Sequence, residues 1–376
     1  MWVHELENWT NFKWDSEALA SKLANVRYRQ GLLLGRMEGL GFDLEEVSLN
    51  TLTDDVVKSS AIEGVNLNRQ KVRSSIARRL GINVGGLVSS GRDEDGIVEM
   101  MLDATQNFSE PLTKERLCNW HATLFPDGTS DGQKIRTGDW RKERDGPMQV
   151  VSGDYGKERT HYVAPDANRL EEEMQEFLEW FDNDPDIDPV LKVGIAHYWF
   201  VAIHPFEDGN GRIGRAICDM ALARADGTPK RYFSLSSQIE AETQHYYSHL
   251  DKQGRLGSSD LTGWLSWYLD CLERAIANAE KTISNALSKG ELWGTIDPST
   301  VNERQQLIIN RMLEKNFVGH MNTSKYAKMA KCSNDTALRD IKELKDRGIL
   351  VQNPGGGRST SYRLPDWERE ETKTRR

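Results

Sequence analysis

The sequence HPFEDGNGRIGR at residues 204–215 joins two segments that are predicted to be helices. The apolar run at 190–203 has the length of a buried helix. Pro205 ends this helix, because proline disfavours helical geometry in the residue before it. A second helix is predicted to begin near Gly209–Gly211 and to run to Ala225. The stretch is therefore predicted to be a loop held between two helices.

The start of the second predicted helix has the features of an anion site. Its glycines let the backbone approach a ligand, and the unpaired first-turn N–H groups attract negative charge. Arg212 and Arg215 lie three positions apart, where cations are unfavourable unless an anion is bound. Asp208 suits Mg²⁺ shared with phosphates, and His204 has the ordinary pKa of a general base. Taken one at a time, His204 could be a packed core histidine and the arginines could be solvated surface residues. The spacing of all of them together predicts a polyphosphate site.

The spacing H-P-F-x-D-G-N-G-R-x-x-R resembles the signature of the Fic family and matches it at every specified position. The resemblance implies a mainly α-helical core that transfers AMP from ATP to a Ser, Thr or Tyr hydroxyl of a target protein, with pyrophosphate as the leaving group. It implies that His204 is the base, Asp208 the magnesium ligand, Gly209, Asn210 and Gly211 the anion hole, and Arg212 and Arg215 the phosphate contacts.

An N-terminal helix is predicted at about 51–64, with Thr51 as its N-cap and Gly64 as its C-terminal cap. Ser59 and Glu63 lie four apart on one face. Glu63 stands at the pole where a carboxylate is least favourable, so we expect a positive partner. The pattern S-x-x-x-E-G resembles the inhibitory motif of some Fic proteins. By this resemblance Glu63 pairs with Arg215 and the unmodified enzyme is weakly active.

Segments 148–152 and 160–163 have the pattern of a β-hairpin. A small surface hairpin is the general interpretation. In the Fic resemblance it is a flap to which the target adds a strand through main-chain hydrogen bonds, so the target cannot be inferred from it. The segment around Tyr246 and Tyr247 resembles the part of Fic proteins beside the adenine pocket, and either ring is a candidate contact. The glycine-rich piece at 81–96 lacks a P-loop pattern and is predicted to be a loop.

The last segment differs in charge from the rest of the chain. From residue 296 onward there are sixteen Lys and Arg against eleven Asp and Glu, a net of +5, although the whole chain carries −9. Three predicted helices and a glycine–arginine hairpin resemble a winged helix-turn-helix. The candidate DNA contacts are Arg339, Lys342, Lys345, Arg358 and Arg363. Acidic residues offset the third helix, so DNA contact and a protein-interaction role both remain open.

The length of 376 residues fits two or three domains. We predict an N-terminal helical region at 1–90, a Fic catalytic domain at 91–290, a winged helix domain at 296–365 and a charged tail at 366–376. No membrane span or signal peptide is predicted, so the cytoplasm is the expected compartment. The four cysteines lack paired spacing and are expected to be reduced. His245 and His249 lie four apart but lack the carboxylate pattern of a metal site.

Two other functions remain open from the sequence. The same site would also serve the removal of AMP from modified protein, with Glu63 orienting a water molecule. Alternatively, the chain is a DNA-binding regulator whose Fic body is a sensor. The intact motif favours an enzyme over the second alternative. ATP, a target protein and Mg²⁺ are the expected ligands, and the long apolar helix at 260–287 closes the catalytic domain or forms a homodimer contact.

Overall fold

The computed structural model describes residues 1–39, 44–82, 87–143, 147–152, 159–183, 186–296, 300–313, 317, 319–354 and 360–365. They divide into two compact units, Met1–Ala279 and Glu280–Arg376. Most of the described residues are helical, which confirms the predicted mainly α fold. The predicted domain boundaries at 90 and 296 remain predictions, and the predicted tail at 366–376 lies outside the described residues.

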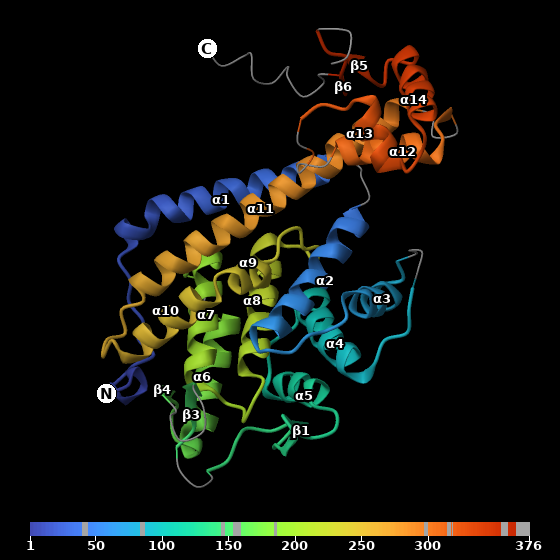
Figure 1. The fold of residues 1–376 in the computed structure, drawn as a ribbon. Coiled ribbons are helices and arrows are strands. Elements are labelled where there is room, and N and C mark those ends of the chain that lie inside the picture. The colour runs from blue at the N-terminus through green and yellow to red at the C-terminus, as the bar shows by residue number, and fades with distance from the viewer. Residues whose placement is uncertain are drawn as a thin grey trace. The chain divides into compact units, whose positions relative to one another are not determined.

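Two packed helices form the centre of the first unit: α7 (Pro189–Ile203) and α8 (Asn210–Asp226) (Figure 1). Asp188 caps α7 by accepting a hydrogen bond from the Val190 N–H, and nearly every α7 side chain is buried. A helix that is apolar on all faces must be surrounded by other elements. The loop between α7 and α8 is therefore held by the most buried pair of helices in the unit.

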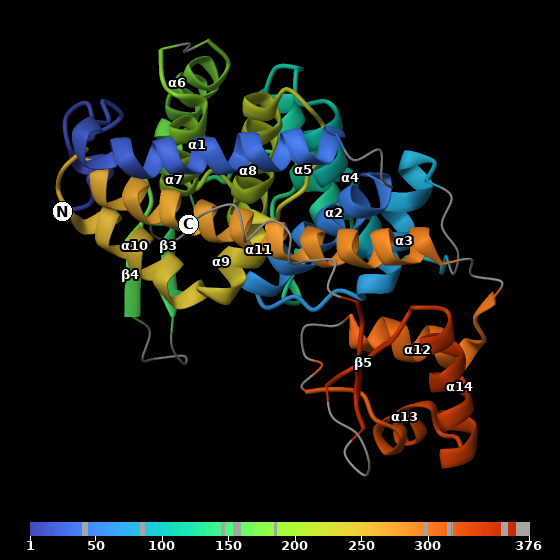
Figure 2. The same cartoon turned by 90° about the horizontal axis from the view of Figure 1, so that it is seen from above.

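The remaining helices of the first unit surround this pair. They are α1 (Ser16–Gly39), α2 (Leu44–Ile62), α3 (Arg69–Leu80), α4 (Arg92–Gln106), α5 (Lys114–Leu124), α6 (Leu170–Asn183), α9 (Leu235–Ala241), α10 (Thr243–Arg255) and α11 (Thr262–Thr295), with the 3₁₀ helices η1 (Val3–Glu5) and η2 (Ala167–Arg169). The boundary between the units falls within α11. Within the first unit α1 runs alongside α11 (Figures 1 and 2), and Lys22 pairs with Asp270 at 2.6 Å.

The N-terminal aromatic residues pack on α7. Trp9 is 3% exposed, contacts the ring of Trp199 edge-on and donates a hydrogen bond from its indole to Glu173. Phe12 contacts Tyr198 and Trp199 in the same way. These rings are anchors of the kind that the clustered aromatic residues predict.

Two short antiparallel pairs belong to the first unit: β1 (Thr129–Ser130) with β2 (Gln133–Lys134), and β3 (Gln149–Ser152) with β4 (Arg159–Val163). In the second pair Gln149 lies opposite Val163 and Ser152 opposite Arg159, with an irregularity between Val150 and Val151. The predicted hairpin is therefore present. The Ala164 N–H donates to the Met148 carbonyl and extends the pairing by one step. The Tyr162 hydroxyl donates to the Ala202 carbonyl at 3.0 Å and so attaches the hairpin to the end of α7.

The structure corrects the predicted start of the helix at about 51–64. α2 begins at Leu44, so Thr51 lies inside the helix and is not its N-cap. Leu49 and Leu52 are both fully buried, and this burial outweighs the capping preference of threonine. The predicted end is correct: Gly64 has a φ of 79°, and the Val65 N–H donates to the Ser60 carbonyl as in a helix-ending turn.

The helix α3 is not predicted from the sequence. Its few apolar residues, chiefly Val72 and Ile76, form a single buried stripe in a strongly basic segment. The Asn68 side chain caps it by accepting hydrogen bonds from the N–H groups of Gln70 and Lys71. Local capping and contacts to α2 and α4 stabilise a helix whose periodicity is weak.

The second unit contains α12 (Glu303–Met312), α13 (Thr323–Ala330), α14 (Asn334–Asp346) and the antiparallel strands β5 (Val351–Gln352) and β6 (Tyr362–Arg363). Its core is apolar and includes Ile308, Ile341 and Tyr362. The Met321 N–H and the Tyr362 carbonyl form a hydrogen bond that joins the start of α13 to β6. This order matches the one expected, but the wing tip at 355–359 lies outside the described residues and the winged-helix assignment remains a prediction.

The structure also bears on the hydropathy of the helices and on the state of the cysteines. Among the described helices, none is both long enough and apolar enough to cross a membrane. All four cysteines are free thiols, and three of them are buried.

We predict that Gly96→Ala strongly destabilises the first unit. A Cβ at Gly96 on α4 would lie 1.9 Å from the Thr123 carbonyl oxygen on α5, and no side-chain rotation relieves a contact with backbone. The free energy of unfolding should fall by about 2–4 kcal/mol, measured by urea denaturation. Gly31→Ala on α1 is the control, because nothing lies within 4 Å of its Cβ; it should leave stability unchanged or raise it. Equal stability of the two variants would contradict this packing.

Candidate functional site

His204 occupies the C-terminal cap of α7 in a left-handed conformation with a φ of 53°. Its N–H donates to the Phe200 carbonyl, and its ring nitrogen Nδ1 lies 3.3 Å from the Val201 carbonyl oxygen. A proton on Nδ1 satisfies that contact and leaves Nε2 as the acceptor. Burial lowers the pKa of His204 to about 4, and the charge of Arg141 acts in the same direction. The imidazole is therefore neutral near pH 7.

The loop after His204 is fixed by buried contacts. Phe206 is fully buried and stacks on the ring of His121 at 4.2 Å between centroids, so it anchors the loop in the core. The Asn210 side chain accepts from the Phe206 N–H and donates to the Phe206 carbonyl, at 2.9 and 2.8 Å. Asn210 thus braces the loop through its side chain, and only its main chain is left to contact a ligand.

Asp208 lies beside this brace. One carboxylate oxygen accepts a hydrogen bond from the Ser130 hydroxyl, and the other accepts from the Gly209 N–H. The carbonyl of Asp208 lies 3.2 Å from His121 Nε2. No group of three or more His, Cys, Asp or Glu in the described part of the chain has a metal-binding arrangement. One carboxylate together with substrate phosphates is, however, a donor set that Mg²⁺ uses.

The start of α8 presents positive charge. Gly209 precedes the helix with a φ of 80°, and the first-turn N–H groups of Asn210, Gly211 and Arg212 have no acceptor within the helix. The Arg212 side chain is 10% exposed, lies over the Phe125 ring and is 3.7 Å from Asp208. Its buried Nε has no partner among the described residues.

Arg215 is the most buried cation of the motif, at 1% exposure. Its Nε donates to the Ser59 hydroxyl, and its Nη2 donates to the Ser59 carbonyl and to Glu63 Oε1, each at 2.8 Å. Burial acts against the charge, but the Glu63 carboxylate raises the pKa of Arg215. The predicted contact between Glu63 and Arg215 is thus present in the structure. The effect of this contact on activity remains a prediction.

The Glu63 carboxylate also lies against the start of α8. A Cβ added to Gly211 would be 2.0 Å from Glu63 Oε1 and 3.1 Å from Arg215 Nη1. Only a glycine at 211 leaves room for this carboxylate. An anionic oxygen from the protein therefore stands at the helix N-terminus, where an anion is favourable.

A cavity of about 720 Å³ brings several of the predicted residues together. His204, Gly211, Glu63, Tyr246 and Tyr247 line it. Tyr246 is 1% exposed, and its hydroxyl is 2.9 Å from His197 Nε2, so much of its ring is packed. Tyr247 is 42% exposed, which makes it the more accessible of the two candidate ring contacts. The strands of the hairpin form another wall, which includes Val150, Val151, Arg159, His161 and Tyr162.

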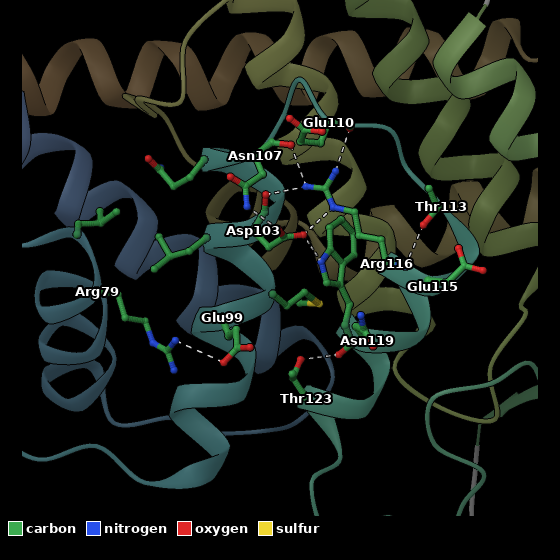
Figure 3. Close-up of a pocket in the computed structure, with 15 residues that line it drawn as sticks. Arg79, Glu99, Asp103, Asn107, Glu110, Thr113, Glu115, Arg116, Asn119 and Thr123 are labelled. Carbon is green, nitrogen blue, oxygen red and sulfur yellow. Dashed lines mark hydrogen bonds and ion pairs between the residues drawn. The ribbon is translucent and has the colours of Figure 1, made fainter.

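A second cavity of about 730 Å³ lies beside α4 and α5 and contains none of the predicted site residues (Figure 3). There Arg116 points to Asp103 and to the carbonyls of Asn107 and Glu110, and Arg79 pairs with Glu99. Both arginines of its lining are thus paired with carboxylates of the same lining, so we interpret it as a structural crevice.

The other predicted residues lie elsewhere. Arg339, Lys342 and Lys345 are exposed on α14, Arg363 is on β6, and Arg358 lies outside the described residues. His249 Nδ1 is 2.8 Å from the carbonyl of His245, which is a contact along the helix α10 and not a shared metal site.

Three contacts of the motif were not anticipated from the sequence: Arg141, Ser130 and His121. Arg141 Nε donates to the His204 carbonyl at 2.7 Å. His121 comes from α5, Ser130 from β1 and Arg141 from the irregular segment before β3, and no periodicity or spacing connects them to residues 204–215. A buried arginine in the short stretch GDWRKE was the only available signal, because arginine is seldom fully buried without partners.

Comparisons with known proteins agree with this geometry. Residues 2–82 match a domain of unknown function (DUF4172), and residues 111–222 match the Fic/DOC family. The chain is 32% identical over 227 residues to the protein adenylyltransferase Fic of Nematostella vectensis, covering 59% of this chain and 47% of that protein. It is 25% identical over 281 residues to the protein adenylyltransferase Fic of Aedes aegypti, covering 69% and 51%. The chain thus spans about half the length of these relatives.

Among solved structures, a Fic family protein from Desulfovibrio desulfuricans G20 matches with 20% identity, coverage of 92% of this chain and 96% of that chain, and a TM-score of 0.49. Fic-1 from C. elegans has 21% identity, coverage of 71% and 74%, and a TM-score of 0.46. The motif HPFEDGNGRIGR lies inside the range that matches the family by sequence. Residues 111–222, which contain this motif, are thus similar in sequence to the Fic/DOC family.

Proposed function

We propose that this protein is an adenylyltransferase that moves AMP from ATP to a hydroxyl side chain of a target protein. The observation that supports it best is a single cavity that holds a neutral histidine, the N-terminus of α8 and a carboxylate paired with Arg215. The relatives named above are protein adenylyltransferases, which agrees with this chemistry.

In this reaction His204 Nε2 accepts the proton of the target hydroxyl. The hydroxyl oxygen forms a bond to the α-phosphorus, the bond from that phosphorus to the bridging oxygen breaks, and pyrophosphate leaves with the electron pair. The proton on Nδ1 remains with the Val201 carbonyl and fixes the ring orientation. No covalent enzyme intermediate is required, so positioning and charge stabilisation supply the catalysis.

The phosphates would lie against the start of α8. The first-turn N–H groups and the unpartnered Nε of Arg212 donate to phosphate oxygens, and Arg215 would contact the terminal phosphate. Asp208 would hold Mg²⁺, which neutralises phosphate charge when bound. Tyr247, or the accessible edge of Tyr246, would contact the adenine ring.

We propose that Glu63 inhibits the reaction. Its carboxylate already satisfies Arg215 and lies against Gly211, so a terminal phosphate and Glu63 compete for the same donors. Each tenfold of repression requires about 1.4 kcal/mol of preference for the closed arrangement, which is within the range of a partly buried ion pair.

The target would be recognised at the hairpin β3–β4. β3 pairs with β4 on one edge, and its Val150 and Val151 also line the cavity that contains His204. A segment added to β3 through main-chain hydrogen bonds would bring a hydroxyl side chain toward the imidazole.

We predict that Glu63→Gly raises AMP transfer about tenfold or more and that adding His204→Ala lowers it by about 10²–10⁴. The measurement is protein-bound label from ATP labelled at the α-phosphate, with Mg²⁺. Asp54→Ala is the matched control, because it breaks an exposed α2 ion pair with Arg69 away from the cavity. Glu63→Gly that gains nothing, or His204→Ala that retains transfer, would count against the proposal. Loss of label from modified protein that requires Glu63 would instead support AMP removal at this site.

The pH dependence should differ from that of an ordinary histidine. Because burial lowers the pKa of His204 to about 4, the imidazole accepts protons above that pH and fails only as the pH falls through it. In Glu63→Gly we expect the transfer rate at saturating ATP to fall less than about twofold between pH 7.5 and 5.5, because removing Glu63 also removes a charge that raises this pKa. Circular dichroism at each pH controls for unfolding. An acidic limb with a midpoint near 6.5 would contradict a buried, neutral base.

One observation supports DNA binding by the second unit as an additional function. Asp340, one of the acidic residues that offset α14, is 1% exposed and turned inward to Arg304 and Tyr326. Arg339 and Lys342 remain exposed on the same helix.

If this surface binds DNA, the full chain should bind a duplex with an affinity that falls as salt rises, and Arg339→Ala with Lys342→Ala should reduce the slope of that dependence by about 2. Fluorescence anisotropy with a labelled duplex measures both. Arg92→Ala in the first unit is the control. Absence of binding at low salt would leave the protein-interaction role for this unit.

A further inference from the structure

The turn that carries His204 is held from behind by one buried side chain, Arg141. Its Nε donates to the His204 carbonyl at 2.7 Å, and its Nη2 donates to the Pro165 carbonyl at 2.5 Å and lies 3.5 Å from the Ile203 carbonyl. The main-chain N–H of Arg141 donates to the Pro205 carbonyl at 2.8 Å. One residue thus contacts three consecutive carbonyls at the end of α7.

These contacts stabilise two unfavourable features of the backbone at the end of α7. The last carbonyls of a helix lack partners within it, and a non-glycine residue in the left-handed region is unfavourable unless its surroundings hold it there. His204 is such a residue. The planar guanidinium matches this task, because it donates in a fixed fork to two separate carbonyls, which the single ammonium of a lysine does not reproduce.

The charge of Arg141 is held without a carboxylate at bonding distance. The side chain is 6% exposed, and burial lowers the pKa of Arg141 to about 10. Among the described residues, its guanidinium donates only to main-chain carbonyls. A cation at the C-terminal end of α7 is favoured by the helix dipole. The Pro165 contact joins the segment after β4 to the same group, so the base of the hairpin and the His204 turn share one anchor.

We propose that Arg141 is a positioning residue that fixes the His204 turn and thereby aims the imidazole into the cavity where transfer takes place. This inference rests on the proposed role of His204 as the base. Arg141 itself does not line that cavity. It lines a separate cavity of about 540 Å³ with Met148, Asp166 and Glu207, so it acts on the base from the opposite side of the loop.

The first test uses the Glu63→Gly background, in which transfer is measurable. Arg141→Lys and Arg141→Ala should lower the turnover number for AMP transfer about 10–100-fold, while the dissociation constant for Mg·ATP changes less than about twofold. Added methylguanidinium should raise the turnover number of Arg141→Ala by about tenfold or more and leave that of the parent unchanged. The reason is that the 540 Å³ cavity gives this small cation access to the position that the arginine side chain has left. Folded Arg141→Ala that transfers AMP at the parent rate would overturn the inference.

Arg116 provides a matched control. It is also a largely buried arginine that donates to main-chain carbonyls, those of Glu110, Asp103 and Asn107, but it lies beside α4 and α5 (Figure 3). Arg116→Ala should lower the melting temperature and leave the turnover number per folded molecule unchanged. A loss of turnover equal to that of Arg141→Ala would show that any buried arginine has this effect and would overturn the specific role.

A second readout does not depend on transfer. In the absence of nucleotide and Mg²⁺, the His204 imidazole is followed by NMR in the parent, Arg141→Lys and Arg141→Ala. Loss of the anchor removes a nearby positive charge and opens the turn to water, so the pKa of His204 should rise from about 4 toward its ordinary value. An unchanged pKa and line width in folded Arg141→Ala would overturn the inference. If Glu63→Gly shows no transfer at all, the proposed function fails, but this titration still decides whether Arg141 positions His204.

Discussion

The structure of this site depends on one constraint, the burial of the Arg215 charge near the N-terminus of α8. A cation there is opposed both by burial and by the positive end of the helix dipole, so an anion must compensate it. Glu63 and the Ser59 hydroxyl and carbonyl do so here, from the C-terminal turn of α2. Under the proposed function a phosphate would use the same donors, so the preference of Arg215 for the internal or the external anion would set the level of activity.

The internal anion is useful only if α2 is held in place. Leu52 and Val56 are fully buried against the unit, and the Ser234 hydroxyl donates to the buried Asp55 carboxylate. Burial raises the pKa of Asp55 well above its ordinary value, and the charge of the Asp219 carboxylate acts in the same direction. The body of α2 is therefore anchored by packing. Glu63 lies just beyond the helix, between its last residue, Ile62, and the turn at Gly64. Displacement of Glu63 then requires movement of a helix end and not of the whole helix.

The parts of the fold that could be predicted from the sequence are those that interactions between neighbouring residues determine. Pro205 ends α7 and Gly64 ends α2 as predicted, because helix-ending signals act over a few residues. The predicted start of α2 was wrong, because the burial of Leu49 outweighs the preference of Thr51 for the N-cap position. The contacts of Arg141 and Ser130 with the motif could not be predicted from the sequence, because they join segments more than sixty residues apart and leave no local pattern.

The motif is consequently held at two ends by different means. At the end that precedes the glycines, Arg141 binds the carbonyls around His204, the proposed base, and would fix its position. At the start of α8, the Glu63 carboxylate occupies a donor of Arg215 that the terminal phosphate would use under the proposed function. Asn210 lies between them and bonds both polar main-chain groups of Phe206, which makes the intervening loop rigid. Because a rigid loop separates the two ends, the proposed inhibition by Glu63 would change nucleotide placement without moving His204, and its release would not require the catalytic geometry to be rebuilt.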